Sequence, residues 1–177
     1  MITKNFKALL QGVLQTGDTK GMVPAKNTSG TTVYIGPSFS SGSCYPYSSN
    51  ETIRIGSIGS NAGVYLGTGD APATENDYTL SSVITSGLSA GAPTVTRGID
   101  ANGNPYKQIV AILTNSTAAD ITIKEIGYIQ PFFASTTQMQ SPSLHHLLLD
   151  HTVLASPVTV PANGTVALKY TLKTIIS

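Results

Sequence analysis

The stretch Thr165-Val166-Ala167-Leu168-Lys169-Tyr170-Thr171-Leu172-Lys173 alternates between apolar and polar side chains along most of its length. On an extended chain, valine, leucine and tyrosine point to one side, and threonine, alanine and lysine point to the other. This period of two is typical of a β-strand with one buried face. The pair Asn163-Gly164 precedes the stretch and predicts a hairpin turn that joins it to a strand at 157–161. The end of the chain therefore favours antiparallel β structure.

Further strand patterns run back through the chain, and they occur at 31–35, 51–58, 63–66, 106–113, 120–129 and 147–154. The segment 106–113 has apolar residues at consecutive positions, which predicts a central strand covered on both faces. In 120–129 the first two isoleucines have the opposite parity to Ile126 and Tyr128, so a one-residue β-bulge near Lys124-Glu125 would bring all four to the core. We expect a mainly β chain that forms an antiparallel β-sandwich of seven to nine strands.

The first fifty residues have a different pattern. Phe6, Leu9, Leu10 and Val13 recur at helical spacing, which predicts a short amphipathic helix at about 3–15 with Thr3 as its N-cap. Glycine and proline then punctuate the chain up to residue 47 and indicate loops. We therefore divide the chain into an N-terminal helix with a loop-rich assembly arm (1–50) and a β-sandwich domain (51–177).

The composition narrows the class of protein. The formal net charge is +1, which gives no electrostatic reason to expect binding to nucleic acid or to an anionic membrane. Charged residues make up 11% of the chain, well below the roughly 25% of average soluble domains. A polar surface with few charges suits a protein that lives in contact with neighbours, although many β-rich proteins share it. The N-terminus has no long apolar run, so we expect no signal peptide, and no stretch is apolar enough for a membrane span.

The densest group of potential metal ligands is His145, His146, Asp150 and His151. Imidazole and carboxylate groups together are common ligands of zinc. On an extended strand, however, His145 and His146 point to opposite faces, and so do Asp150 and His151. A polar loop that runs into a strand explains the same pattern without a metal. Cys44 is the only cysteine, so neither an intrachain disulfide nor a zinc site of paired cysteines is expected.

The segment 67–77 places Asp70, Glu75 and Asp77 in a glycine-rich loop. Calcium favours oxygen ligands in such loops, but their order does not match an EF-hand. The alternative is a turn in which these side chains bind local backbone groups. The chain also contains no tryptophan. We expect no enzymatic activity, no cofactor and no small-molecule substrate.

One phrase resembles a family. The stretch Gly63-Val64-Tyr65-Leu66-Gly67-Thr68-Gly69-Asp70-Ala71-Pro72-Ala73-Thr74-Glu75-Asn76-Asp77-Tyr78-Thr79-Leu80 is similar to a strand and loop common in structural proteins of tailed bacteriophages. Segments like 115–127 and 148–160 follow at similar distances, so the resemblance spans roughly residues 60–175. That family often has a basic residue before an acid in the last segment, where this chain has Asp150-His151.

The resemblance implies a virion component that is made in the host cytoplasm and assembles as a homo-oligomer with other virion proteins, on the capsid as decoration or at the neck or tail. We expect no nucleic acid or membrane as partner. The subunit contacts expected from the sequence involve Phe6, Leu9, Leu10, Val13, Tyr45 and Tyr47. For the helix residues, burial in their own subunit is an equal alternative. A β-sandwich module that recognises carbohydrate or a host surface through Tyr45-Pro46-Tyr47 is the alternative function.

Overall fold

The computed structural model describes residues 1–14, 22–36, 52–58, 62–137 and 142–173, and the side chains of 12–14 are not part of this description. Within these ranges there are one helix and ten strands. Their bounds are α1 Lys4–Leu14, β1 Val23–Lys26, β2 Thr32–Ile35, β3 Thr52–Arg54, β4 Gly63–Gly67, β5 Leu88–Ala90, β6 Thr94–Ile99, β7 Pro105–Asn115, β8 Ile121–Ala134, β9 Ser143–Val160 and β10 Thr165–Lys173.

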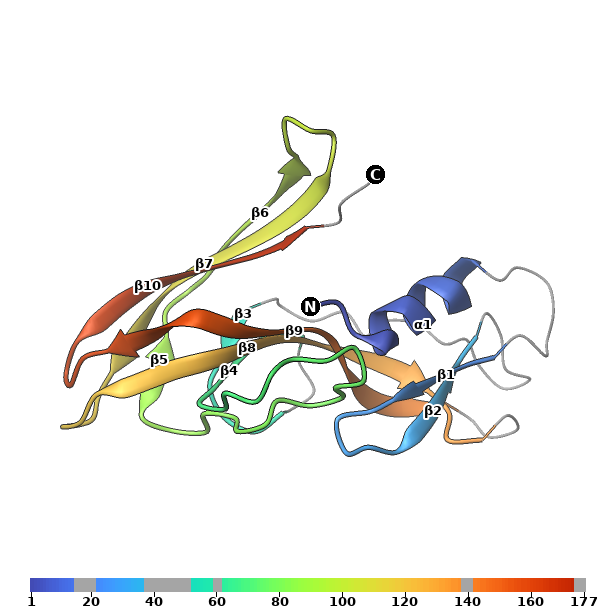
Figure 1. Cartoon of the computed structure of the whole chain (residues 1–177), viewed down its shortest axis with the longest axis horizontal. Helices are drawn as coiled ribbons and strands as arrows, with labels where there is room; N and C mark the ends of the chain where they lie inside the picture. Colours follow the sequence, from blue (N-terminus) through green and yellow to red (C-terminus); the bar gives the residue numbers. More distant parts are fainter. Residues whose placement is uncertain (15–21, 37–51, 59–61, 138–141, 174–177) are drawn as a thin grey trace.

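Two four-stranded sheets enclose the main core (Figure 1). In the first sheet β7 is central, with β10 along one side and β5 followed by β6 along the other. The second sheet has the order β3-β4-β8-β9, and a small β1-β2 sheet lies beside it. Every pairing is antiparallel except that of β3 with β4. The predicted mainly β, sandwich-like fold with a short N-terminal helix is therefore confirmed, and the parallel β3–β4 pair is an addition.

The alternating pattern of β10 is confirmed, but the predicted hairpin before it is wrong. Leu168 and Tyr170 are buried in the main core, whereas the polar side of β10 is exposed. Strand β9 pairs with β8 in the second sheet, and β10 pairs with β7 in the first. The turn at Asn163, which has φ of 53°, therefore passes between sheets. The loop between β7 and β8 holds this turn in place, because the Asn163 amide donates to the carbonyl of Thr117 and the Ala162 amide donates to Asp120.

The irregularity predicted in β8 is confirmed. The register with β9 shifts between Ile123 and Glu125, and after the shift Ile126 and Tyr128 lie in the main core together with Ile123. The partner strand contributes most of the irregularity, since Ile123 pairs with Val158 and Glu125 with Val153. The change of parity turns Glu125 to the opposite face of the second sheet. Its carboxylate is fully buried there.

Strand β7 is central, but it is not covered on both faces as predicted. Ile109, Ala111 and Leu113 are buried on the core side, whereas Ile112 on the other side is 50% exposed. No described element packs over that outer face of the first sheet. The apolar residues on the outer face thus belong to the molecular surface.

One end of the first sheet extends away from the body of the molecule (Figure 1). We call this part the tip ribbon, defined as residues 94–110 and 169–173, which include β6, the first half of β7 and the end of β10. Asp100 closes the turn at its tip by accepting the amides of Asn102 and Asn104 and pairing with Lys173. Ile99, next to this turn, is 73% exposed.

The N-terminal segment is built into the body of its own subunit. The Thr3 amide donates to the carbonyl of Leu149, and the His151 amide donates to that of Met1, so the first residues pair with the edge of β9. Thr3 stands directly before the helix, as predicted, and its carbonyl accepts the amides of Phe6 and Lys7. Its hydroxyl donates to the carbonyls of Leu148 and Leu149. Helix α1 packs Ala8 into the main core.

Candidate functional site

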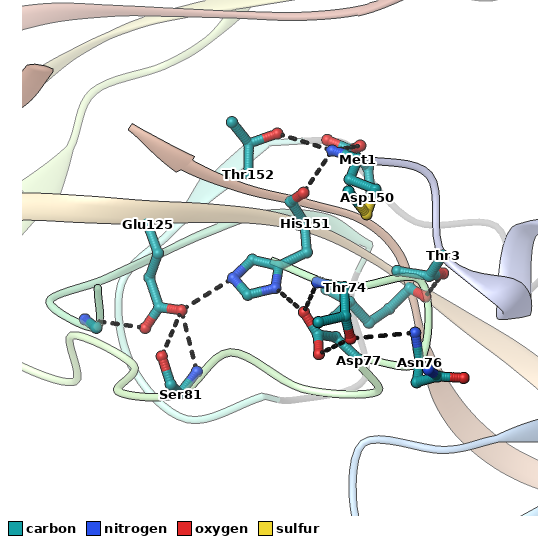
Figure 2. Close-up of polar contacts among 12 residues, drawn as sticks. Met1, Thr3, Thr74, Asn76, Asp77, Ser81, Glu125, Asp150, His151 and Thr152 are labelled. Carbon is teal, nitrogen blue, oxygen red and sulfur yellow. Dashed lines mark hydrogen bonds and ion pairs between the residues drawn. The ribbon is translucent and has the colours of Figure 1, made fainter. Parts of the chain in front are cut away.

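The most highly connected polar site in the described residues is a buried network of two carboxylates and an imidazole (Figure 2). His151 on β9 lies between them, with Nδ1 2.6 Å from Asp77 and Nε2 3.0 Å from Glu125. The side chain of His151 is 4% exposed and that of Glu125 is 0% exposed. Asp77 comes from the long loop between β4 and β5, and it is partly exposed. The network therefore joins this loop to two neighbouring strands of the second sheet.

Glu125 accepts hydrogen bonds from both sides of the loop. One carboxylate oxygen accepts the amides of Gly69 and Ser82 at 3.1 and 2.7 Å. The other accepts the amide and the hydroxyl of Ser81 at 3.0 and 2.9 Å, in addition to the contact with His151. A carboxylate that satisfies so many donors can be buried without an unpaired charge. Glu125 thus fixes both ends of the segment 69–82 to the sheet.

The glycines of the Gly-Thr-Gly phrase allow this close approach. A Cβ atom at Gly67 would lie 2.4 Å from the Glu125 carboxylate, and one at Gly69 would lie 1.9 Å from the Ser81 hydroxyl. Both distances are far below van der Waals contact. A third glycine, Gly127, is needed for packing, since its Cβ would lie 2.8 Å from side chains of Leu80 and Leu148. Together with Tyr65 and Ile129, these two leucines form a second, smaller core under the loop.

The electrostatics favour ionised carboxylates on both sides of the histidine. Burial alone would raise the pKa of Glu125, but the amides of Ser81 and Ser82, the Ser81 hydroxyl and His151 outweigh it and hold that pKa below its usual value. Burial also opposes ionisation of Asp77, and hydrogen bonds from Thr74 and His151 again keep its pKa low. Both ring nitrogens of His151 are within hydrogen-bonding distance of one of these carboxylates. The imidazole ring therefore bridges Asp77 of the loop and Glu125 of β8.

A second ionic contact lies on the other face of β9. Asp150 is 3.1 Å from the amino group of Met1, and its other oxygen accepts the hydroxyl of Tyr170 at 2.8 Å. Burial and the charge of Asp150 raise the pKa of Tyr170 well above its usual range. The ring of Tyr170 also stacks on that of Tyr128, with centroids 6.4 Å apart. This contact links β10 of the first sheet to the edge of the second.

The network joins the loop to the second sheet, and a cavity gives access to it. A cavity of about 240 Å³ reaches it between the loop and β9, lined in part by Asp77, Ser81 and His151. A serine nucleophile needs a neighbouring base that can take its proton. Here the Ser81 hydroxyl donates to Glu125, and both ring nitrogens of His151 contact carboxylates instead of Ser81. What this arrangement can do is hold the loop in one conformation.

The predicted metal ligands do not converge. Asp150 and His151 lie on opposite faces of β9, as predicted. His151 contacts the two carboxylates (Figure 2), whereas Asp150 accepts the hydroxyl of Tyr170. His145 is within hydrogen-bonding distance of Asn27 and Ser143, and His146 follows it on β9. Across the described part of the chain, no group of three or more His, Cys, Asp or Glu side chains has a metal-binding arrangement.

The three carboxylates of the 67–77 loop also go to different partners. Asp70 pairs with Lys124 at 2.9 Å, Glu75 pairs with Lys7 and Lys4 of the helix, and Asp77 accepts the amide and hydroxyl of Thr74. The pKa of Asp70 and that of Glu75 are held below their usual values, in each case by hydrogen bonds and charge from these lysines. The turn interpretation of the loop thus describes its geometry better than a calcium site does.

The residues expected at subunit contacts differ in how far they are buried in their own subunit. Phe6 and Leu9 pack against the main core of their own subunit, whereas Leu10 is 47% exposed. The side chain of Val13 and the whole of Tyr45 and Tyr47 lie outside the described residues. Of the predicted set, Leu10 therefore stays the accessible candidate on the described surface of the helix.

The network itself was not predicted from the sequence. The sequence indicates Asp77 and His151 only as potential metal ligands, and it indicates Glu125 only as part of the β-bulge. The available signal was the bulge itself, because a strand that changes parity at Lys124-Glu125 turns the glutamate away from the main core.

In the described ranges, no helix is long and apolar enough to cross a membrane. No family model, no curated protein and no solved structure matches this chain.

Proposed function

We propose that this protein is a non-enzymatic structural component of a bacteriophage virion, present in many copies on the capsid as decoration or at the neck or tail. The observation that carries the proposal is the tip ribbon. It extends beyond the second sheet and exposes Ile99, and the outer face of the first sheet beside it exposes Ile112. Strand edges and apolar residues that a monomer leaves open are typical of surfaces that bind neighbouring subunits.

The phrase that resembles phage structural proteins gives a second support. Its residues Gly67, Gly69 and Asp77 hold the loop on Glu125 and His151, and Leu80 packs under it. These roles are architectural, as a resemblance among virion proteins would require. A loop of fifteen residues between Thr68 and Ser82 that is tied at several points gives a subunit a fixed outer surface.

Quantitative mass spectrometry of purified particles tests this function. Phage particles from a lysate of the host that encodes this chain are banded on a density gradient, dissociated and digested, and peptides of this chain are measured against isotope-labelled standards. We expect a copy number that matches a symmetric ring or capsid lattice. Disrupted heads and tails, separated on a second gradient, assign the protein to one of them. Absence of the protein from infectious particles would overturn the proposal.

The carbohydrate-binding alternative depends on Tyr45-Pro46-Tyr47, which lies outside the described residues. No described feature favours it, and it stays a prediction that a glycan array can test.

A further inference from the structure

The tripeptide Ala-Asn-Gly occurs twice in the sequence, at 101–103 and at 162–164. An asparagine that precedes a glycine can lose its side-chain amide, because glycine has no side chain to shield its backbone nitrogen from the asparagine. Both asparagines are exposed. The two sites have the same local chemistry, so a difference in reactivity within the folded protein comes from how each turn is held.

The reaction is an intramolecular displacement that needs only water as a further reactant. The backbone nitrogen of Gly103 attacks Cγ of Asn102, the new N–Cγ bond closes a five-membered succinimide ring, and the Cγ–Nδ2 bond breaks. The amide proton of Gly103 leaves with the departing nitrogen as ammonia. Water then opens the ring at either carbonyl, which gives aspartate or isoaspartate. Isoaspartate has an extra methylene group in the main chain.

Ring closure requires the attacking amide to leave its own hydrogen bond. In the first turn the Gly103 amide donates to the carbonyl of Asp100 at 3.0 Å. In the second turn the Gly164 amide donates to the carbonyl of Pro161 at 2.9 Å. The two nitrogens are therefore held alike by their own turns, and the difference lies in how each turn contacts the rest of the protein.

The turn at 161–164 is fastened to the end of β7 and to the loop that follows β7. Three long-range hydrogen bonds join them: from the amides of Ala162 and Asn163 to Asp120 and the Thr117 carbonyl, and from the Asn115 amide to the Gly164 carbonyl. Opening this turn disrupts contacts with a separate part of the chain. The second asparagine therefore stays in its turn conformation most of the time.

The turn at 100–104 is held by its own residues and by Lys173. Asp100 accepts two amides of the turn and pairs with that lysine. A Cβ atom at Gly103 would have no described neighbour within 4 Å beyond the adjacent residues. The turn lies at the end of the tip ribbon, which extends away from the body of the molecule (Figure 1). Segments with exposed hydrogen bonds and few packed neighbours open at low free energy.

We propose that Asn102, at the end of the tip ribbon, is a site of deamidation through a succinimide, whereas Asn163 is protected by its contacts with the β7–β8 loop. The modification adds a negative charge close to the exposed Ile99, and the isoaspartate form also lengthens the main chain of the turn. The tip ribbon therefore changes as the molecule ages. The inference does not depend on the virion role, since the reaction follows from the geometry of the turn.

Peptide mass spectrometry of the intact, folded protein tests the inference. The full chain is incubated at physiological temperature in water enriched in the heavy oxygen isotope, and samples are digested at intervals. Replacement of NH₂ by a heavy hydroxyl group gives a defined mass increase, and electron-transfer fragmentation separates isoaspartate from aspartate. We expect the modified fraction to grow at least about tenfold faster at Asn102 than at Asn163, with isoaspartate among the products, because three further hydrogen bonds oppose opening of the second turn.

The unfolded chain is the matched control, since both tripeptides are free in concentrated guanidinium chloride and their rates should become similar. Asp120→Ala removes one acceptor from the protected turn, so it should speed the reaction at Asn163 and leave the rate at Asn102 unchanged. A folded-state rate at Asn163 equal to or above that at Asn102, or aspartate as the sole product, would overturn the proposal. An unchanged rate at Asn163 in Asp120→Ala would contradict the protection assigned to the loop.

Discussion

Glu125→Gln is the substitution that tests the buried network most directly. Glutamine has nearly the same shape, so the packing around residue 125 is preserved while one acceptor oxygen becomes an NH₂ group. One oxygen of Glu125 accepts two amides, and the other accepts two donors from Ser81 as well as His151. Even in its better orientation, the glutamine leaves the amides of Gly69 and Ser82 facing a donor.

The expected cost follows from these unpaired groups. A buried donor left without an acceptor costs about 1–3 kcal/mol, and breaking a buried ion pair by changing one partner costs about 3–5 kcal/mol. We therefore expect a loss of about 3–5 kcal/mol in the free energy of unfolding. For a domain of this size, that corresponds to a fall in Tm of roughly 6–20 °C.

Urea unfolding followed by circular dichroism measures the free energy, and hydrogen exchange locates the change. Exchange at the amides of Gly69, Ser81 and Ser82 should rise first, because the loop is released before the first sheet opens. The matched control is Asp70→Asn in the same loop, whose exposed carboxylate pairs only with Lys124 and should matter little. A Glu125→Gln protein within about 0.5 kcal/mol of the wild type would refute the reasoning.

Four further predictions concern the same structure. Gly69→Ala should destabilise the fold by about 1–3 kcal/mol or more, because its Cβ would meet Ser81 and Glu125, whereas Gly91→Ala, whose Cβ would lie 3.6 Å from the carbonyl oxygen of Ile112, should be close to neutral in thermal melts. The pKa values of Glu125 and Asp77 are lower in the folded protein than their ordinary values of 4.5 and 3.8, so their stabilisation is fully present above these values and is lost as the pH falls from them through the lower pKa values of the folded state. Urea midpoints measured between pH 3 and 7 (roughly the range over which carboxylates titrate) should fall on the acidic side, less steeply in Glu125→Gln, and a pH-independent midpoint would contradict this. Tyr170→Phe should cost about 1.5–3 kcal/mol through the lost hydrogen bond to Asp150 while the ring stack remains, and a double-mutant cycle with Asp150→Asn should show strong coupling, so additive effects would count against the contact. Deletion of residues 1–16 should destabilise the subunit itself, since Thr3 and Ala8 are buried in it, whereas Leu10→Ser should leave the melting temperature of the isolated subunit unchanged and weaken assembly only if the helix contacts a neighbour.

The strand pattern was readable from the sequence wherever one face of a strand is buried. β10 alternates because its core side contacts the first sheet's interior, and the parity change in β8 required the irregularity that the structure has. The prediction that β7 is covered on both faces was wrong because Ile112 is apolar and yet exposed. The pattern of apolar residues alone cannot distinguish a covered face from an exposed one. β6 was missed since Gly98 interrupts its pattern; in the structure the ring of Tyr106 covers that glycine from the next strand.

The site was less predictable for a physical reason. Asp77, Glu125 and His151 are far apart in the sequence, and only the pairing of β8 with β9 and the course of the loop bring them together. Spacing rules for metal ligands or catalytic groups apply to local motifs and do not find such a contact. The hairpin prediction at Asn163-Gly164 was wrong for a similar reason. The turn geometry is set locally, but which strands pair is determined by the packing of the two sheets.

The pairing of Thr3 with Leu149 has a consequence for synthesis. The segment Met1–Thr3 hydrogen-bonds to a strand that is about 146 positions further along the chain. This segment therefore stays unpaired until β9 has been synthesised, and at ~5–20 residues per second the intervening residues take many seconds to translate. Contacts of such long range slow folding, because loop closure precedes any gain from the contact. The second sheet is thus completed late, and a chain that stalls before β9 has no edge with which Met1–Thr3 can pair.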